Sequence, residues 1–224
     1  MPTPKAATLV DNASSLRLAG PPSRFVSRGG EKLAGALKVF DIAVVGKHCL
    51  DAGASTGGFT DCLLQEGASS VVALDVGYGQ LAWRLRNDPK VRVIERTNIR
   101  HISPEEAGGP FDVIVADLSF ISLCTVGAAL VDLGTSNAEY VLLVKPQFEA
   151  GRSRVGKGGI VRDPVVHMDV LNRVISCLEE IGLGTRQVIQ SPIRGAEGNL
   201  EFLLWARAGR ATVDDAAITK VVNG

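Results

Sequence analysis

Five short apolar runs, each separated from the next by a longer segment, constrain the fold of this 224-residue chain more than any other feature. Near-continuous apolar strands joined by helix-length segments indicate a parallel sheet that is covered on both faces. Two further runs follow, joined by a loop with proline and glycine, and the second of them is apolar enough to be central. The chain is therefore predicted to be a doubly wound α/β domain with a mostly parallel seven-stranded sheet and an antiparallel last strand. The seven predicted strands are Cys49-Leu50, Val71–Leu74, Val91–Ile94, Val113–Ala116, Tyr140–Val144, Thr185–Gln190 and Asn199–Ala206.

Helices are predicted from apolar spacing and from end signals. Leu33, Ala36, Leu37 and Phe40 recur at helical spacing and form one apolar face. Asp163-Pro164 supplies an N-cap and a first-turn proline for a helix that ends before Gly182. Residues 213–222 are expected to form a short, loosely packed helix.

Composition excludes some classes of protein. No apolar run approaches the ~20 residues that span a bilayer, and residues 1–20 lack a secretory signal. The four cysteines (Cys49, Cys62, Cys124 and Cys177) form no Cys-x-x-Cys pair, so we expect buried thiols in a reducing compartment, with neither a disulfide nor a zinc site. The histidines His48, His101 and His167 show no metal-ligand spacing. The cytoplasm is the expected location, and no metal or membrane partner is expected.

Basic residues gather in two stretches although the formal net charge is zero. Local patches meet phosphates, so net charge alone does not exclude nucleic acid. Solvated surface charge is the alternative interpretation. The two clusters comprise Arg84, Arg86, Lys90, Arg92, Arg96 and Arg100, and then Lys145, Arg152, Arg154, Lys157 and Arg162.

A glycine-rich turn, residues 51–60, connects the first strand to a helix. Glycines at such a turn let the backbone approach a ligand closely. Asp75 ends the second strand, 22 residues after Gly53, where a carboxylate can accept hydrogen bonds from both ribose hydroxyls of an adenosine. Asn98 follows the third strand and is placed to reach the adenine edge. Dehydrogenases are the main competitor, but their G-x-G-x-x-G spacing differs from Gly53, Gly57 and Gly58 here.

Five segments resemble the TlyA family of FtsJ-like RNA methyltransferases. They are Ser27–Leu33, Leu50–Thr60, Asp75–Leu81, Ala116–Leu123 and Val144–Glu149, and the likeness covers nearly the whole chain. The resemblance implies S-adenosylmethionine as cofactor and methylation of cytidine 2′-hydroxyls in ribosomal RNA of one or both subunits. In mycobacterial members this modification is linked to sensitivity to capreomycin and viomycin. The implied cofactor contacts are Gly53, Ser55, Thr56, Gly57, Gly58, Phe59, Thr60, Asp75, Val76, Asn98 and Asp117.

Family members begin with a small RNA-binding module of the ribosomal-protein alpha-L type. Residues 1–22 are expected to hold only a remnant of this module and a linker, and residues 23–224 the methyltransferase domain. The missing part would weaken autonomous ribosome binding without altering the chemistry.

FtsJ-like enzymes use a Lys-Asp-Lys-Glu tetrad, which maps here onto Lys32, Asp117, Lys145 and Glu201. Asp117 and Lys145 end apolar strands at the carboxyl edge of the sheet, where open α/β folds bind ligands. Glu201 interrupts an apolar strand, which is unfavourable unless the carboxylate is paired. Lys145 is expected to act as base or hydroxyl-orienting group, with Lys32 as the second cation. Ordinary salt bridges are the alternative.

RNA contacts are expected at Arg24, Arg28, Phe120, Arg152 and Arg154. Phe120 is a candidate to stack on a flipped base, with a core phenylalanine as the alternative. Arg24-Phe25-Val26 is either a packed linker or, by resemblance, a relay between RNA and cofactor binding. Three other functions remain: a membrane-active cytolysin, which the family's haemolysin label suggests, a small-molecule O-methyltransferase, and a ribosome-binding factor without catalysis.

Overall fold

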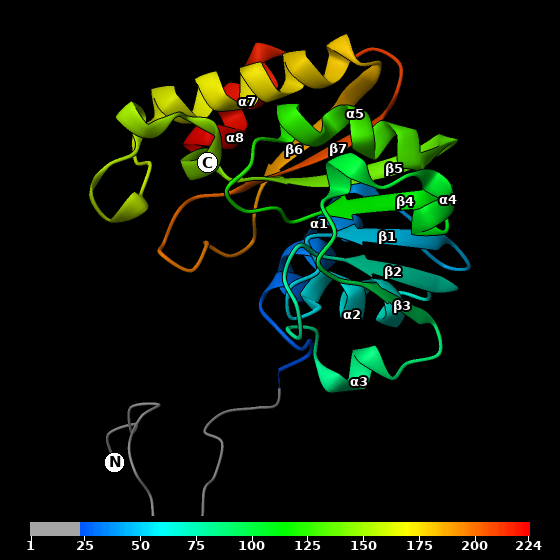
Figure 1. Ribbon diagram of the computed structural model, residues 1–224. Coiled ribbons are helices and arrows are strands. Elements are labelled where there is room, and N and C mark those ends of the chain that lie inside the picture. Colours follow the sequence, from blue (N-terminus) through cyan, green and yellow to red (C-terminus); the bar gives the residue numbers. More distant parts are fainter. Residues whose placement is uncertain (1–22) are drawn as a thin grey trace, which may run out of the picture.

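The computed structural model describes residues 23–224 and contains the predicted seven-stranded, mostly parallel sheet. Strands β1 to β5 pair in parallel in the order β3-β2-β1-β4-β5. Strand β7 then lies between β5 and β6 and is antiparallel to both, which confirms a central, antiparallel last strand (Figure 1). The seven strands are β1 (His48–Ala52), β2 (Ser70–Leu74), β3 (Val91–Ile94), β4 (Phe111–Ala116), β5 (Gly134–Val144), β6 (Leu183–Gln190) and β7 (Phe202–Ala208).

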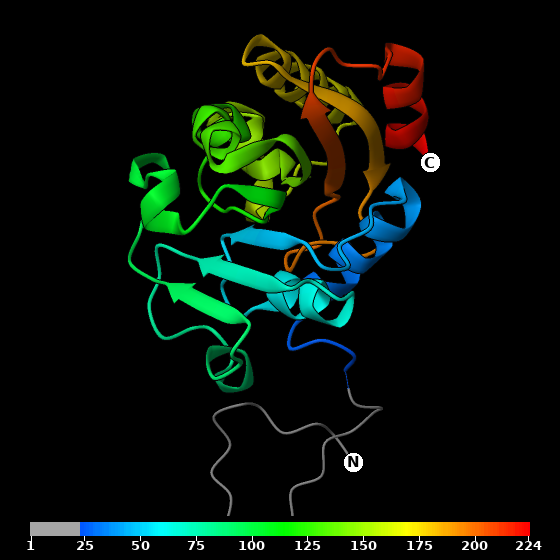
Figure 2. The same ribbon diagram turned by 90° about the vertical axis from the view of Figure 1, so that its right-hand side faces the viewer.

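Helices cover both faces of the sheet (Figure 2). On one face α1 (Gly29–Phe40) and α2 (Gly58–Gln65) bury Leu33, Leu37 and Leu63 against the strands. On the other face lie α4 (Pro104–Ala107), α5 (Leu123–Leu133), α7 (Pro164–Glu180) and α8 (Asp215–Asn223). Alternate strand residues therefore face two separate apolar layers, as expected for a sheet buried on both sides.

Short helices fill the connections: α3 (Trp83–Arg86), α6 (Pro146–Glu149), and the 3₁₀ turns η1 (Ile99–His101), η2 (Arg152–Arg154) and η3 (Lys157–Gly159). The start of α7 is as predicted, because the Asp163 carboxylate accepts the backbone N–H of Val165 at 2.9 Å and Pro164 occupies the first turn. The prediction of a loosely packed last helix is wrong. Ile218 and Val222 of α8 are buried, because the apolar stripe of α8 packs against α7 and β6.

Two of the cysteines form a disulfide, which corrects the expectation of four free thiols. Cys124 at the start of α5 is bonded to Cys177 near the end of α7, with the Cα atoms 5.7 Å apart. The sequence separation of 53 hides this proximity, since it arises only from the packing of α5 on α7. Cys49 and Cys62 are buried free thiols, and burial raises the pKa of each to about 12.

Candidate active site

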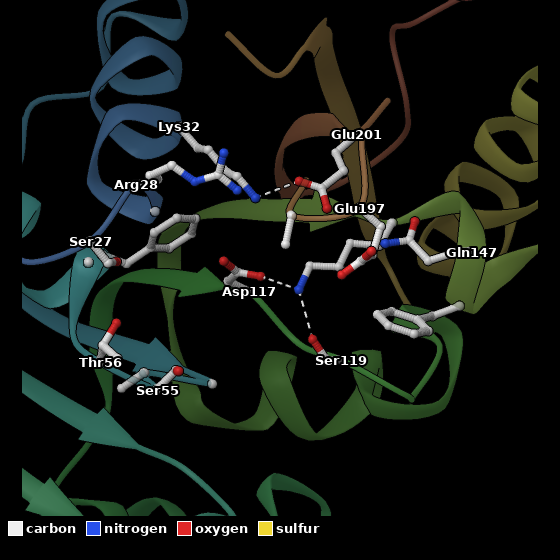
Figure 3. A pocket seen from close by; sticks show the side chains of 18 residues that line it. Ser27, Arg28, Lys32, Ser55, Thr56, Asp117, Ser119, Gln147, Glu197 and Glu201 are labelled. Atoms are coloured by element: carbon white, nitrogen blue, oxygen red, sulfur yellow. Dashed lines mark hydrogen bonds and ion pairs between the residues drawn. The ribbon is translucent and has the colours of Figure 1, made fainter. Parts of the chain in front are cut away.

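Two ionisable side chains meet at the carboxyl edge of the sheet because their strands are neighbours. Asp117 follows β4 and Lys145 follows β5, and these strands pair in parallel with Ala116 opposite Leu142. Lys145 Nζ lies 2.6 Å from Asp117 Oδ1 and donates a hydrogen bond to Ser119 Oγ at 2.9 Å (Figure 3). An ammonium has three donors, so at least one is left for a substrate oxygen.

A second ion pair joins the two ends of the domain. Lys32 lies in the first turns of α1, and its Nζ donates to Glu201 Oε2 at 2.5 Å. The side chains are only 9% and 3% exposed, so the pair is nearly dehydrated. Glu201 was predicted within the last strand but lies one residue before β7, where its backbone carbonyl accepts the N–H of Ser191 at 2.8 Å. A Cβ atom on Gly195 would be 2.5 Å from Glu201 Oε1, so a glycine there leaves room for the carboxylate.

Both pairs line one cavity of about 580 Å³, here called the catalytic cavity (Figure 3). The structure thus brings together all four residues of the predicted tetrad. Arg28 and Glu197 also line the cavity, so charges of both signs surround its interior. Such a cavity can hold a hydroxyl beside a lysine while carboxylates fix the lysines in place.

A second cavity of about 410 Å³ adjoins the first and is here called the nucleoside cavity. It is lined by Asp75, Val76 and Asn98, all predicted cofactor contacts, and shares Gly53 and Asp117 with the catalytic cavity. S-adenosylmethionine has a nucleoside at one end and an amino acid at the other. Two joined cavities at the carboxyl edge of the sheet suit such a molecule.

The glycine turn fits a cofactor that lies against the backbone. Gly53 has φ +87°, and a Cβ atom there would be 2.7 Å from the Asp117 carbonyl oxygen. The Asp75 carboxylate accepts the backbone N–H groups of Ser55 at 2.8 Å and Gly77 at 2.6 Å, which fixes it at the cavity wall. A ribose hydroxyl pair would therefore meet a preoriented acceptor.

The remaining predicted cofactor residues divide into two groups. Ser55, Thr56, Gly58 and Phe59 line the catalytic cavity. Gly57 and Thr60 line neither of the two cavities, and instead shape the turn. A Cβ atom on Gly57 would collide with Leu85 and Leu81, and the Thr60 hydroxyl donates to Asp51 Oδ2 at 2.7 Å. Asn98 caps η1 by accepting the N–H of Arg100 at 3.1 Å.

Asp51 is fully buried beneath this turn. Its Oδ2 accepts hydrogen bonds from the backbone and hydroxyl of Thr60, while Oδ1 has no partner among residues 23–224. Burial raises the pKa of Asp51 to about 7, and the charge of Asp117 adds to this effect. Asp51 is therefore a buried acid that holds a proton near neutral pH.

Phe120 lies at the mouth of the nucleoside cavity, not in the core, so the alternative interpretation of this residue is wrong. It is 89% exposed and has a left-handed backbone with φ +65°. Its ring lies 4.8 Å from that of Phe148, which lines the catalytic cavity. An exposed ring at the nucleoside cavity is thus held against a half-buried ring at the catalytic cavity.

The predicted RNA-binding arginines occupy three different environments. Arg28 reaches the catalytic cavity. Arg24 pairs with Glu66 at 2.9 Å and stacks over Phe25, which is buried against α1. Arg152 and Arg154 lie on η2, and Arg154 pairs with Asp169 at 2.5 Å.

Sequence reasoning missed several residues of the site. Ser119, Gln147, Phe148 and Glu197 line the catalytic cavity. Glu149 is buried and accepts the Ser122 hydroxyl at 2.6 Å and the Leu123 N–H at 2.8 Å, which fixes the segment that carries Phe120. All but Glu197 lie within five residues of Asp117 or Lys145. Polar or aromatic residues close to the predicted strand ends were therefore the sequence feature that could have identified them.

The part of the chain that the structure describes shows neither a cluster of metal ligands nor a membrane-spanning helix. Two of the histidines form hydrogen bonds within the protein: His48 with Ser70 and Gly108, and His167 with Val161. Within residues 23–224 no three histidine, cysteine or acidic side chains gather as metal ligands. No helix in this part of the chain has the length and apolar character to span a membrane.

A parallel sheet with an antiparallel inserted strand, a glycine turn after β1 and an acid after β2 defines the Rossmann-like methyltransferase class. The same fold occurs in an S-adenosylmethionine-dependent methyltransferase from Mesorhizobium loti, which superposes with a TM-score of 0.57 at 15% identity, over 79% of this chain and 97% of that chain.

Within this class, the profile of the FtsJ-like methyltransferases matches residues 25–208, and the chain belongs to that family. It is 53% identical over 208 residues to the 16S/23S rRNA (cytidine-2′-O)-methyltransferase TlyA of Mycobacterium tuberculosis, covering 92% of this chain and 78% of that protein. A solved structure of a candidate hemolysin from Streptococcus thermophilus is 42% identical with a TM-score of 0.87, over 92% of this chain and 76% of that chain.

Proposed function

We propose that this chain transfers a methyl group from S-adenosylmethionine to a cytidine ribose 2′-hydroxyl of ribosomal RNA. The observation that supports this most strongly is the convergence of Lys32, Asp117, Lys145 and Glu201 on one cavity that adjoins the nucleoside cavity. The relative from Mycobacterium tuberculosis is named for this reaction on both ribosomal RNAs. A ribosomal substrate also implies a cytoplasmic location.

The cofactor would lie across both cavities. Asp75 would accept the ribose hydroxyls, Val76 and Asn98 would face the adenine, and the backbone at Gly53 would run beside the chain that leads to the sulfur. When bound, S-adenosylmethionine supplies an electrophilic methyl group on a sulfonium. Asp117 lines both cavities, and Lys145, which contacts it, lines the catalytic cavity, so the target hydroxyl would be presented beside this pair.

Lys145 has the central role in the proposed mechanism. An alcohol is a weak nucleophile until a neighbouring group takes or stabilises its proton. The Nζ atom of Lys145 is fixed by Asp117 and Ser119, so its remaining hydrogen-bonding position is directed by the protein. We propose that Lys145 orients the 2′-hydroxyl and that its neutral form accepts the hydroxyl proton.

Lys32 and Glu201 act on the same cavity from the opposite wall. A second cation favours the neutral form of a nearby amine, whereas carboxylates favour its charged form. Glu201 holds the Lys32 ammonium at 2.5 Å and so restrains both its position and its charge. The proposed contribution of this pair is geometry, because well-oriented reactants gain ~7–11 kcal/mol.

The proposed RNA contacts surround the cavity mouth. Phe120, exposed beside Phe148, would stack on the target base after it leaves the helix. Arg28 would meet the backbone near the cavity, and Arg24, Arg152 and Arg154 would contact more distant phosphates. Residues 1–22, which the prediction assigns to a remnant RNA-binding module and linker, lie outside the described residues.

The test is transfer of labelled methyl from S-adenosylmethionine to ribosomal subunits that are unmethylated at this site. The chain would be run beside a fusion to the N-terminal module of a full-length relative. Transfer by both, or by the fusion alone, supports the proposal, and the second result assigns docking to the module. If neither transfers methyl while calorimetry shows cofactor binding, the ribosomal substrate is wrong and small-molecule hydroxyls become the substrates to test. Cofactor-independent leakage of liposomes at micromolar protein would instead support the cytolysin.

A further inference from the structure

A third cavity, of about 330 Å³, lies beside the catalytic cavity and is here called the arginine cavity. It lies between the start of α7, the 191–201 loop and the end of α8. Both the loop before α7 and the 191–201 loop lie at the edge of the sheet that carries the active site (Figure 1). Glu197 lines both cavities, so the two are neighbours. Residues that line it include Arg162, Pro164, His167, Arg194, Glu197 and Val222.

Positive charge is in excess at this cavity. Among residues 23–224, neither Arg162 nor Arg194 forms an ion pair, and Arg194 donates only to the Gly198 carbonyl at 3.2 Å. Asp163, which caps α7, does not line the cavity, so Glu197 is the carboxylate on its wall. Two guanidinium groups against one carboxylate leave a net positive charge on the wall, which favours a bound anion.

A buried histidine, His167, also lines the arginine cavity. His167 is 4% exposed, and its Nε2 lies 3.1 Å from the Val161 carbonyl oxygen. A carbonyl oxygen only accepts, so Nε2 carries the hydrogen and Nδ1 is the acceptor in the neutral ring. Burial lowers the pKa of His167, and the charge of Arg194 lowers it further. The wall therefore combines two guanidinium groups with a neutral histidine side chain.

The walls of the cavity are fixed to each other before any ligand binds. Asn199 is 2% exposed; its Oδ1 accepts the Val161 N–H at 3.0 Å and its Nδ2 donates to the Gly159 carbonyl at 2.9 Å. One buried amide thus joins the segment that carries Arg162 to the loop that carries Arg194. Glu201 lies two residues further along, so the arginine cavity and the ion pair with Lys32 share one scaffold.

We propose that the arginine cavity binds the backbone phosphate of a nucleotide that flanks the target in the RNA strand, through Arg162 and Arg194. The inference rests on the proposed function and adds to it the path of the substrate. A single strand would present its target nucleotide to the catalytic cavity, pass Glu197, and place a neighbouring phosphate between the two guanidiniums. Arginine forks match phosphate oxygens in geometry as well as charge.

The test compares the double substitution R162Q/R194Q with the wild-type chain and with R210Q. Arg210 follows β7 at the opposite edge of the sheet, so its substitution removes an exposed arginine charge far from all three cavities. For each protein, KM and kcat for methyl transfer to unmethylated ribosomal subunits are measured over a range of salt concentrations. Cofactor affinity and the thermal midpoint are recorded alongside.

The expected result is a KM for RNA raised about 10-fold or more in R162Q/R194Q, with kcat, cofactor affinity and thermal midpoint unchanged. The dependence of log KM on log salt concentration should become shallower by about 0.7 for each single-strand phosphate that the variant no longer neutralises. The substitution pair R162K/R194K should recover much of the affinity, and R210Q should match the wild type.

Unchanged KM and salt dependence in R162Q/R194Q, with an active wild type, would overturn this inference and leave the proposed function intact. A fall in kcat or in cofactor affinity with KM unchanged would also overturn it. A wild-type chain that methylates no ribosomal RNA, alone or fused to the N-terminal module, would overturn the proposed function itself, and the inference with it.

Discussion

Substitutions in the ion pair between Lys32 and Glu201 can distinguish its effect on folding stability from its effect on catalysis. Removing one partner of a buried pair costs ~3–5 kcal/mol, whereas replacing both with apolar groups of similar volume is often neutral. The side chains are 9% and 3% exposed, so Lys32→Met would leave the Glu201 carboxylate in a nearly dry site. A Lys32→Met chain should therefore unfold more easily than the wild type, and Lys32→Met/Glu201→Met should regain the loss.

An upper limit can be set on the free energy of unfolding that Lys32→Met loses. An unpaired Glu201 can escape its penalty by binding a proton, and at pH 7 this costs about 4 kcal/mol for a carboxyl with an ordinary pKa near ~4.3. The loss in Lys32→Met is thus expected at about 3–4 kcal/mol at pH 7 and only about 1 kcal/mol at pH 5. Dividing by a urea dependence of ~3 kcal/mol/M places the midpoint about 1 M lower at pH 7.

The assay is urea unfolding of the wild type, both single variants and the double variant at the two pH values, with methyl transfer measured on the same samples. We expect the double variant within about 1 kcal/mol of the wild type in stability and without activity. A double variant no more stable than Lys32→Met, or a loss that is equal at pH 5 and pH 7, would refute the reasoning that an uncompensated Glu201 charge causes the instability.

Three further outcomes are expected. Lys145→Ala should abolish methyl transfer and leave cofactor affinity, measured by calorimetry, within about twofold; normal turnover would remove Lys145 from the mechanism. Phe120→Ala should lower kcat/KM for RNA about 5- to 150-fold, which corresponds to ~1–3 kcal/mol of base stacking. The thermal midpoint should not change, because the Phe120 ring is exposed. Methylation at the wild-type rate would exclude stacking. Burial raises the pKa of Asp51 to about 7. Between about pH 4 and pH 7 the folded protein therefore holds a proton that the unfolded chain releases. The free energy of unfolding should fall by up to about 4 kcal/mol as the pH rises through this range. Asp51→Asn should lose that dependence in urea unfolding at pH 5 and pH 8, and an identical slope in both proteins would assign it to other groups.

The sheet was predictable from the sequence because its strands are nearly continuous apolar runs. The order of β5, β7 and β6 was predictable in part, since the apolar character of residues 202–206 indicates a central strand. The predicted limits of β7 differ from the observed ones by three residues at its start and two at its end, which places Glu201 just before the strand, where the ladder with β5 has ended. The last helix and the Cys124–Cys177 disulfide depend on contacts between distant elements, which spacing along the chain does not reveal.

The candidate site shows the same division. Asp117, Lys145 and Asp75 follow strands, so their positions at one edge of the sheet follow from parallel pairing. Lys32 and Glu201 were assigned through the family resemblance, because no local pattern relates an early helix to the last strand. The arginine cavity was not predictable, since it forms only where the 191–201 loop meets the start of α7.

The separation of Lys32 and Glu201 along the chain has a consequence for the timing of activity. They are 169 residues apart, so this contact contributes strongly to the contact order of the domain. Domains are synthesised from the N-terminus and fold as units, at ~5–20 residues per second. While β7 is still inside the ribosomal exit tunnel, Glu201 is absent from the site, the neighbours β5 and β6 lack their shared strand, and Lys32 has no counterion. The arrangement therefore makes catalytic competence one of the last properties that a nascent chain acquires.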